Sequence, residues 1–230
     1  MKLWKQTMTE QQPGVPILYS TFPYKQQLNN VLRAEQHGIC CYCQRRIDHH
    51  EGNPKHGSHN EHLYPEHGQP NCEQLQMEYT NIYACCIDSQ GHPKREKHLR
   101  YCGEAKEDKM IPTLVQDEKC ASYFRYNVLG EIIPNGCYDK WEDYTDNEST
   151  LSDKVLDAYQ CIKVLNLNCV TLINARYEAQ QVLMTIVKKW SADELKGRLA
   201  GYSKSNTYPE FYEMCVQYIQ RRIDLLSKRS

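Results

Sequence analysis

The sequence lacks three features that would each place it in a broad class of proteins. Neither sign of charge is in clear excess, because 28 lysines and arginines are balanced by 29 aspartates and glutamates, so no overall basic field indicates nucleic-acid binding. No apolar run approaches the roughly 18 residues that a membrane-spanning helix needs, and no membrane association is expected. The opening stretch MKLWKQTMTEQQPG has no apolar segment typical of a secretory signal peptide. We therefore expect a cytoplasmic, globular protein.

Histidine is missing from the second half of the chain. All nine histidines lie between His37 and His98, and the same stretch contains dense groups among the 12 cysteines, such as CCYC at 40–43. Two thiolates at Cys-x-x-Cys spacing can hold one zinc ion from a tight turn. In a reducing compartment such groups favour metal binding over disulfides, and the βαβ pattern expected around a redox pair is missing. The chemistry is therefore expected in the first half.

The spacing of apolar and turn residues divides the chain into four parts. They are an N-terminal arm and helix at 1–39, a core of short strands around the cysteines at 40–112, a hairpin and linker at 113–150, and a helical region at 151–230. The predicted fold class is α+β, mostly helical.

Local patterns predict individual elements within these parts. The spacing of Ser191-Ala-Asp-Glu194 is that of a capping box, which marks the start of a helix. Helices are expected at about 24–36, 152–165, 170–190 and 209–227, a short strand at 61–63, and a hairpin that turns near 127–130.

Glu61 and His62 are the most suggestive polar pair, because they stand directly before Leu-Tyr-Pro. Histidine titrates near neutral pH and can accept a proton from water. A carboxylate is a hard oxygen ligand that suits Mg²⁺. The plain alternative is a Glu-His pair exposed at the end of a strand.

Asn81 and the later cysteines supply the other candidate groups. The amide oxygen of Asn81 can coordinate a cation, or its side chain can orient a base, although a lone loop asparagine is usually only a turn residue. A second thiolate pair is needed for a four-cysteine zinc site. Cys86 and Cys102 are available, Cys85 and Cys41 are adjacent rivals, and spacing does not choose within each doublet.

The order Cys-x-x-Cys, Glu-His-x-x-Pro, Asn, Cys, Cys-x-x-x-Lys resembles the HNH endonucleases, whose ββα-metal motif is often braced by a four-cysteine zinc. The segments EQHGICCYC, EHLYP, YTNIYACC and YCGEAK are similar to the HNH effectors of retron and Septu antiphage systems, the PtuB-like proteins. The resemblance spans most of the chain, including VLNLNCVTLINAR in the helical half.

The resemblance implies a zinc-stapled ββα-metal (HNH) core with a C-terminal helical region. His62 matches the general base that activates water. Glu61 and Asn81 match the residues assigned to a catalytic divalent cation, Mg²⁺ or Mn²⁺. The structural zinc would be held by Cys40, Cys43, Cys86 and Cys102. This assignment leaves Cys41 and Cys85 as ordinary buried thiols.

One position departs from the family pattern. Many HNH enzymes place histidine or asparagine directly after the last zinc cysteine, as a cation ligand. Here Gly103 stands at that place. Asp108, His98 or water is the expected substitute.

The resemblance also implies partners. A PtuA-like ATPase of the SMC/ABC type is expected to bind the helical region, and a retron system adds a reverse transcriptase with its multicopy single-stranded DNA. The expected activity is toxic cleavage of DNA or RNA. Two other classes stay open: a non-catalytic zinc-binding adaptor, and an enzyme that uses Cys41 or Cys85 as a nucleophile.

Overall fold

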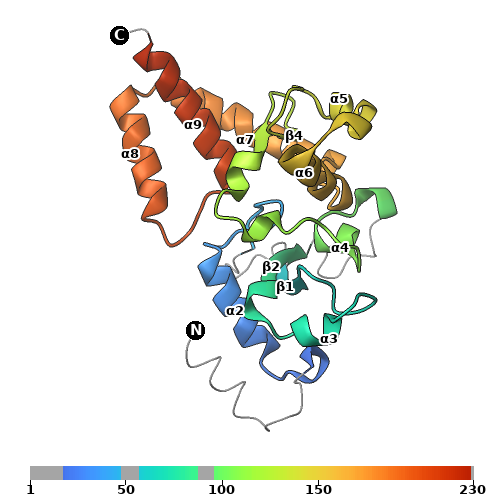
Figure 1. The fold of residues 1–230 in the computed structure, drawn as a ribbon. Coiled ribbons are helices and arrows are strands. Elements are labelled where there is room, and N and C mark those ends of the chain that lie inside the picture. Colours follow the sequence, from blue (N-terminus) through green and yellow to red (C-terminus); the bar gives the residue numbers. More distant parts are fainter. Residues whose placement is uncertain (1–17, 48–56, 88–95, 229–230) are drawn as a thin grey trace.

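The computed structural model describes residues 18–47, 57–87 and 96–228. Most of the expected arm, residues 1–17, lies outside these ranges. Figure 1 shows helix α2 and strands β1 and β2 at one end of the molecule, and helices α7, α8 and α9 toward the other. The predicted class, α+β and mostly helical, is confirmed.

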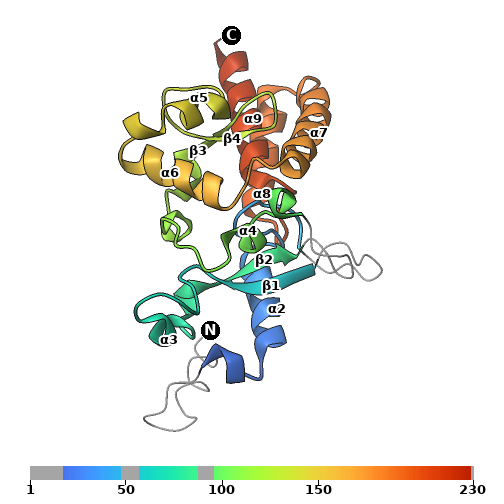
Figure 2. The ribbon, with the colours of Figure 1, turned by 90° about the vertical axis from the view of Figure 1, so that its right-hand side faces the viewer.

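The N-terminal end of the molecule is built from α2 (Lys25–Glu35) and an antiparallel hairpin of β1 (Gly57–His62) and β2 (Ile82–Ile87). Leu28 and Leu32 stand one helical turn apart and are buried, as the apolar spacing predicts. The two elements are tied together by polar contacts, because Asn29 on α2 donates to Asn60 on β1 at 2.9 Å. Figure 2 shows the hairpin lying across α2.

Two short helices flank the hairpin. Helix α3 (Cys72–Leu75) lies in the connection between β1 and β2, and α4 (Gly103–Lys106) follows the hairpin. The order along this part of the chain is β1, α3, β2 and α4, with turns of 3-10 helix before β2 and before α4.

A second small hairpin joins the two ends. Strands β3 (Phe124–Tyr126) and β4 (Ile132–Pro134) are antiparallel, and the turn between them falls where the sequence predicts it. Gly130 has a φ of +83°, and a Cβ there would lie 2.5 Å from the carbonyl oxygen of Ile173. Both the backbone conformation and the close approach require glycine.

The C-terminal half is helical, as expected. The spacing of apolar residues predicts three of its helices to within a few residues, and the capping box of Ser191 and Glu194 forms at the start of the fourth. The helices are α5 (Trp141–Asp146), α6 (Asp153–Val164), α7 (Val170–Val187), α8 (Ala192–Ser203) and α9 (Tyr212–Ser227). Turns of 3-10 helix lie at Tyr19–Thr21, Tyr79–Asn81, Lys97–Leu99, Leu114–Gln116, Cys120–Tyr123 and Glu148–Thr150.

One hydrophobic core crosses the boundaries between the predicted parts. A single cluster of buried residues contains Leu28 of α2, Cys86 of β2, Leu172 of α7 and Met214 of α9. The helical half is therefore packed against the cysteine-rich end and supports it.

The segment before α9 also clamps the turn that contains the first cysteines. The backbone of Phe211 donates to the carbonyl of Gln44 at 2.9 Å, and Arg45 pairs with Glu210 at 2.9 Å. The C-terminal half thus fixes the conformation of this turn from outside. Within the ranges described, no helix combines the length and the apolar character needed to cross a bilayer.

Candidate metal centre

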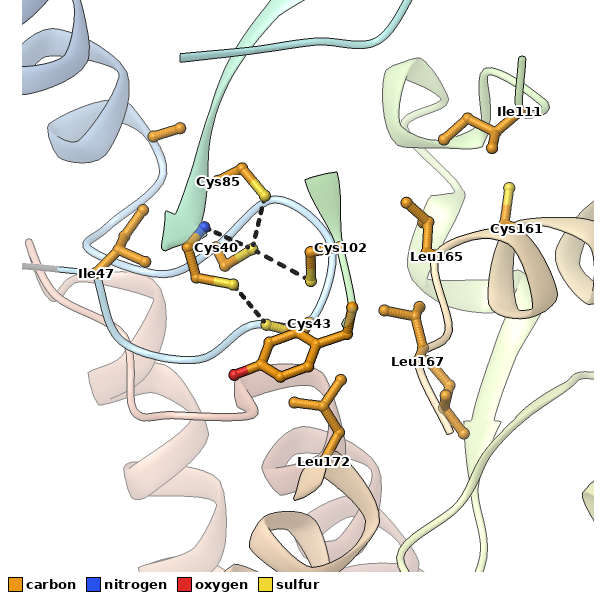
Figure 3. Close-up of a cluster of buried hydrophobic side chains, with 14 of the residues drawn as sticks. Cys40, Cys43, Ile47, Cys85, Cys102, Ile111, Cys161, Leu165, Leu167 and Leu172 are labelled. Carbon is orange, nitrogen blue, oxygen red and sulfur yellow. Dashed lines mark hydrogen bonds between the residues drawn. The ribbon is translucent and has the colours of Figure 1, made fainter. Parts of the chain in front are cut away.

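Buried sulfur atoms gather where the turn after α2 meets β2 and the start of α4. The sulfurs of Cys40, Cys85, Cys86 and Cys102 all lie within 4.8 Å of one another. Cys40 Sγ is 3.9 Å from Cys85 Sγ and 4.0 Å from Cys102 Sγ (Figure 3). Zn–S bonds of about 2.3 Å in a tetrahedron separate the sulfurs by about 3.8 Å. The cluster is therefore compatible with a structural zinc site.

The first cysteine sits in a tight turn that directs amide groups at its sulfur. Cys40 N donates to Arg45 O at 2.8 Å, and Gln44 takes a left-handed conformation with a φ of 61°. The amides of Tyr42 and Cys86 point at Cys40 Sγ from 3.5 and 3.4 Å. Amide donors aimed at a sulfur stabilise its thiolate form, which is the form that binds metal.

Cys43 and Cys85 compete for the fourth place in a zinc tetrad. The prediction uses Cys43, whereas the four mutually close sulfurs include Cys85 instead. Cys43 Sγ nevertheless lies 3.6 Å from Cys86 Sγ, so a fifth sulfur touches the cluster. Cys43 remains a predicted ligand. The spacing of the cysteines did not show that both Cys85 and Cys86 bring their sulfurs to the same cluster.

Burial opposes ionisation of these thiols, but at Cys40 hydrogen bonds from neighbouring thiols outweigh it and lower the pKa. Burial raises the pKa of the Cys102 thiol well above its ordinary value, and it does the same to the thiols of Cys41 and Cys85. A reactive nucleophile needs a lowered pKa instead. The raised pKa values of Cys41 and Cys85 therefore do not favour a cysteine nucleophile at either position.

A second potential metal-binding group lies beside the sulfur cluster. Ligand atoms of His59, Glu61 and Cys85 fall within 4.8 Å of one another. Alternate residues of a strand share a face, so His59 and Glu61 project from the same side of β1, and His59 stands opposite Cys85 in the hairpin register. His59 Nε2 is 3.1 Å from Glu61 Oε2. His59 was not among the predicted site residues, although its two-residue offset from Glu61 along a strand places both on one face.

Lys106 fixes the other oxygen of Glu61. Its side chain is only 1% exposed, and its Nζ lies 3.3 Å from Glu61 Oε1. The same ammonium donates to the backbone carbonyl of His62 at 2.8 Å. This buried pair joins α4 to β1.

Gly103 faces the His59–Glu61 pair from the start of α4. A Cβ at this position would lie 2.5 Å from Glu61 Oε2 and 2.9 Å from His59 Nε2. The pair therefore fills the space that a side chain at 103 would need. The predicted substitutes do not approach this place: Asp108 is exposed, the His98 side chain is 71% exposed, and neither joins a metal-ligand group with Glu61 in the described ranges.

His62 is separated from Glu61 although the two are neighbours in sequence. Its ring is buried, with Nδ1 3.1 Å from Glu66 Oε1 and Nε2 2.8 Å from the carbonyl oxygen of Gln76. Tyr19 packs edge-on against it at 4.6 Å. A neutral imidazole has one N–H, so it satisfies only one of these two acceptors. The His62 hydrogen bond holds the pKa of Glu66 below its ordinary value.

Asn81 braces the loop between β1 and β2. Its Oδ1 accepts from the amide of Tyr64 at 2.6 Å, and its Nδ2 donates to the carbonyls of Tyr64 and Leu75 at 3.1 and 3.0 Å. The predicted alternative of a cation ligand differs from this geometry, because both ends of the amide are hydrogen-bonded to the backbone.

The structure therefore brings Glu61 to the sulfur cluster and keeps His62 and Asn81 in a separate network. Comparison with protein-family models and with curated proteins found no match. Function is accordingly inferred from the residues and their arrangement.

Proposed function

We propose that this protein is a metal-dependent endonuclease of the HNH type, which hydrolyses phosphodiester bonds in DNA or RNA. One observation carries the proposal. The strand, strand, short-helix path of β1, β2 and α4 holds the Glu61 carboxylate beside His59 and a buried Lys106, directly against the cysteine cluster. The resemblance implies a cation held by Glu61 beside a cysteine-braced core, whereas His59 and Lys106 come from the structure.

Glu61 is the residue that would hold the catalytic cation. Its Oε1 is fixed by Lys106, while its Oε2 faces His59, whose side chain is 35% exposed. A divalent cation bound there would polarise the scissile phosphate and stabilise the leaving oxygen. The role of Lys106 is to hold the carboxylate in place.

His62 is the proposed general base. Glu66 holds Nδ1, so Nε2 is the nitrogen that would accept a proton from water. In the described conformation Nε2 contacts the Gln76 carbonyl, so the base must leave this contact before it can act. Catalysis therefore requires a local movement of the loop that contains Glu66 and Gln76.

Asn81 acts on the same loop as a positioning residue. It bonds the backbone at Tyr64 and Leu75, on either side of Glu66 and next to Gln76. Loss of this amide would release the acceptors that orient the His62 ring. Its effect on cleavage is thus expected through the base rather than through a cation.

The cysteine cluster is the proposed structural zinc site. Such a site is coordinatively closed and contributes folding free energy. We assign Cys40, Cys86 and Cys102 as three ligands and keep Cys43 as the fourth. Cys85 is the weaker choice, because it also faces the His59–Glu61 pair.

The sequence resemblance extends the proposal to a biological role. The chain would act as the toxic effector of a retron or Septu antiphage system, beside an SMC/ABC-type ATPase. The helical region from about residue 151 is the proposed docking surface. In a retron setting, the reverse transcriptase and its single-stranded DNA would join the complex.

The test is cleavage by the purified chain, alone and with the ATPase. Plasmid DNA, phage DNA and total RNA are each incubated with Mn²⁺, with Mg²⁺ and with a chelator that leaves the zinc in place. Cation-dependent cleavage that is lost in Glu61→Ala supports the proposal. Cleavage that persists in Glu61→Ala, with zinc content unchanged, contradicts it.

One observation favours a second candidate, a zinc-braced interaction module without catalysis. His62 is buried and both of its ring nitrogens have partners, so the proposed base does not face solvent. This candidate predicts normal zinc content and partner binding, with no cleavage of any substrate in any cation.

A further inference from the structure

We propose that His59 is a ligand of the catalytic cation, paired with Glu61, and that this pair makes the site prefer Mn²⁺ to Mg²⁺. The inference rests on the proposed function, because it names the ion that the same site takes. Nothing in the family pattern points to His59. The proposal rests on the position of His59 relative to Glu61 and Gly103.

The distance between the two ligand atoms suits a shared octahedral cation. His59 Nε2 and Glu61 Oε2 are 3.1 Å apart. Metal–ligand bonds of about 2.1 Å at right angles place neighbouring ligands about 3.0 Å apart. A cation can therefore replace the hydrogen bond between the two groups with little movement of either side chain. The ring would then keep its proton on Nδ1.

Both side chains are held toward this position by the fold. They stand on one face of β1, and Lys106 occupies the far oxygen of the carboxylate, which leaves Oε2 for a cation. Glu61 is nearly buried, with a side chain 10% exposed, whereas His59 is 35% exposed. The buried ligand is thus fixed, and the exposed one opens the site to solvent and substrate.

Gly103 explains why the ligand comes from a strand rather than from α4. A Cβ at 103 would meet Glu61 Oε2 at 2.5 Å and His59 Nε2 at 2.9 Å. A ligand from residue 103 and the present His59 therefore exclude each other sterically. The glycine leaves room for the imidazole, which supplies the nitrogen that the position after the last cysteine would otherwise supply.

The donor set decides which cation binds best. Carboxylate and water oxygens suit Mg²⁺ and Mn²⁺ alike, whereas imidazole nitrogen favours first-row transition metals over Mg²⁺. Mg²⁺ also loses its water reluctantly. A site with one histidine and one carboxylate, beside the Cys85 sulfur, should therefore bind Mn²⁺ more tightly than Mg²⁺.

The experiment measures binding rather than cleavage. Mn²⁺ is titrated into the zinc-loaded full-length chain, and free Mn²⁺ is followed by electron paramagnetic resonance. His59→Ala should weaken the site at least about tenfold, since even the partners of metal ligands contribute 10- to 100-fold. His98→Ala is a matched histidine variant on an exposed turn, and it should leave the Mn²⁺ affinity unchanged. The zinc content of both variants should equal that of the wild type.

A second variant guards against a folding defect. His59→Gln keeps a polar side chain of similar length but offers an amide oxygen in place of the ring nitrogen. The ratio of Mg²⁺ to Mn²⁺ dissociation constants, measured by competition, should fall by about tenfold. Partial unfolding would lower both affinities together and leave this ratio unchanged.

A third variant tests the exclusion between the two positions. Gly103→His alone should disturb Glu61 and weaken Mn²⁺ binding, whereas His59→Ala with Gly103→His should bind Mn²⁺ more tightly than His59→Ala alone. Unchanged Mn²⁺ affinity in His59→Ala overturns the inference. His59-dependent binding without any nucleic-acid cleavage would instead overturn the proposed function and leave the cation site standing.

Discussion

Replacing His62 with glutamine separates the chemistry of the proposed base from its structural contacts. Glutamine can donate to Glu66 in place of the ring, but it cannot accept a proton from water near neutral pH. The expected loss of cleavage rate is about 10²- to 10⁴-fold, the usual contribution of a positioned acid–base group. Added Mn²⁺ should not rescue the rate, because a cation does not supply a proton acceptor.

The structure also predicts a stability cost for the more common alanine substitution. His62→Ala removes the ring that donates to the Glu66 carboxylate, which costs about 1–3 kcal/mol. For a chain of this size, that corresponds to a fall in Tm of roughly 2–12 °C. The glutamine variant should melt closer to the wild type. Zinc content should stay the same in both, since His62 belongs to neither group of potential metal ligands.

The assay combines cleavage rate against Mn²⁺ concentration with thermal melting and zinc analysis on the same preparations. A slow, zinc-loaded His62→Gln protein with near-normal Tm supports the assignment. A folded His62→Gln protein that cuts at the wild-type rate refutes it, and the base must then be sought elsewhere.

Three further predictions concern the surrounding groups. Cys43→Ser should lower zinc content more than Cys85→Ser, measured by elemental analysis of purified protein; the reverse result would make Cys85 the fourth ligand. Lys106→Met removes the buried partner of Glu61, and denaturant unfolding should show that the free energy of unfolding falls by about 3 kcal/mol. This is at the lower end for a broken buried pair, because the carboxylate keeps its contact with His59. A fall below about 1 kcal/mol would argue against a tight pair. Glu66 has a pKa held below its ordinary value of 4.5 by the neighbouring imidazole, so its stabilising contribution is present just above pH 4.5 and lost as the pH falls through the lowered value. The difference in free energy of unfolding between wild type and Glu66→Gln should therefore shrink on acidification. A difference that grows as the pH falls would contradict a stabilising contribution of the ionised Glu66 carboxylate.

Local patterns in the sequence were sufficient for the regular elements. The apolar spacing of Leu28 and Leu32 specifies α2, and Ser191 with Glu194 specifies the start of α8. The turn before Gly130 was also visible, because each of these signals depends on residues within a few positions of one another. The fold class followed from such signals alone.

The sequence also located the candidate metal-binding cysteines, through their crowding into the first half. It offered Cys40, Cys86 and Cys102 as ligands, and the structure brings these three sulfurs together. What it did not resolve was the choice between Cys43 and Cys85. Residues within a doublet or a short turn differ little in sequence position, and only the path of the chain around them decides which sulfurs converge.

Tertiary structure alone decided the rest of the site. His59 and Gly103 are far apart in sequence, yet a Cβ on one would collide with the ring of the other. Glu61 and His62 are adjacent, yet strand geometry sends their side chains into separate networks. Side chains alternate between the two faces of β1, which separates Glu61 from the adjacent His62. The packing of α4 against β1 brings together His59 and Gly103, which are distant in sequence.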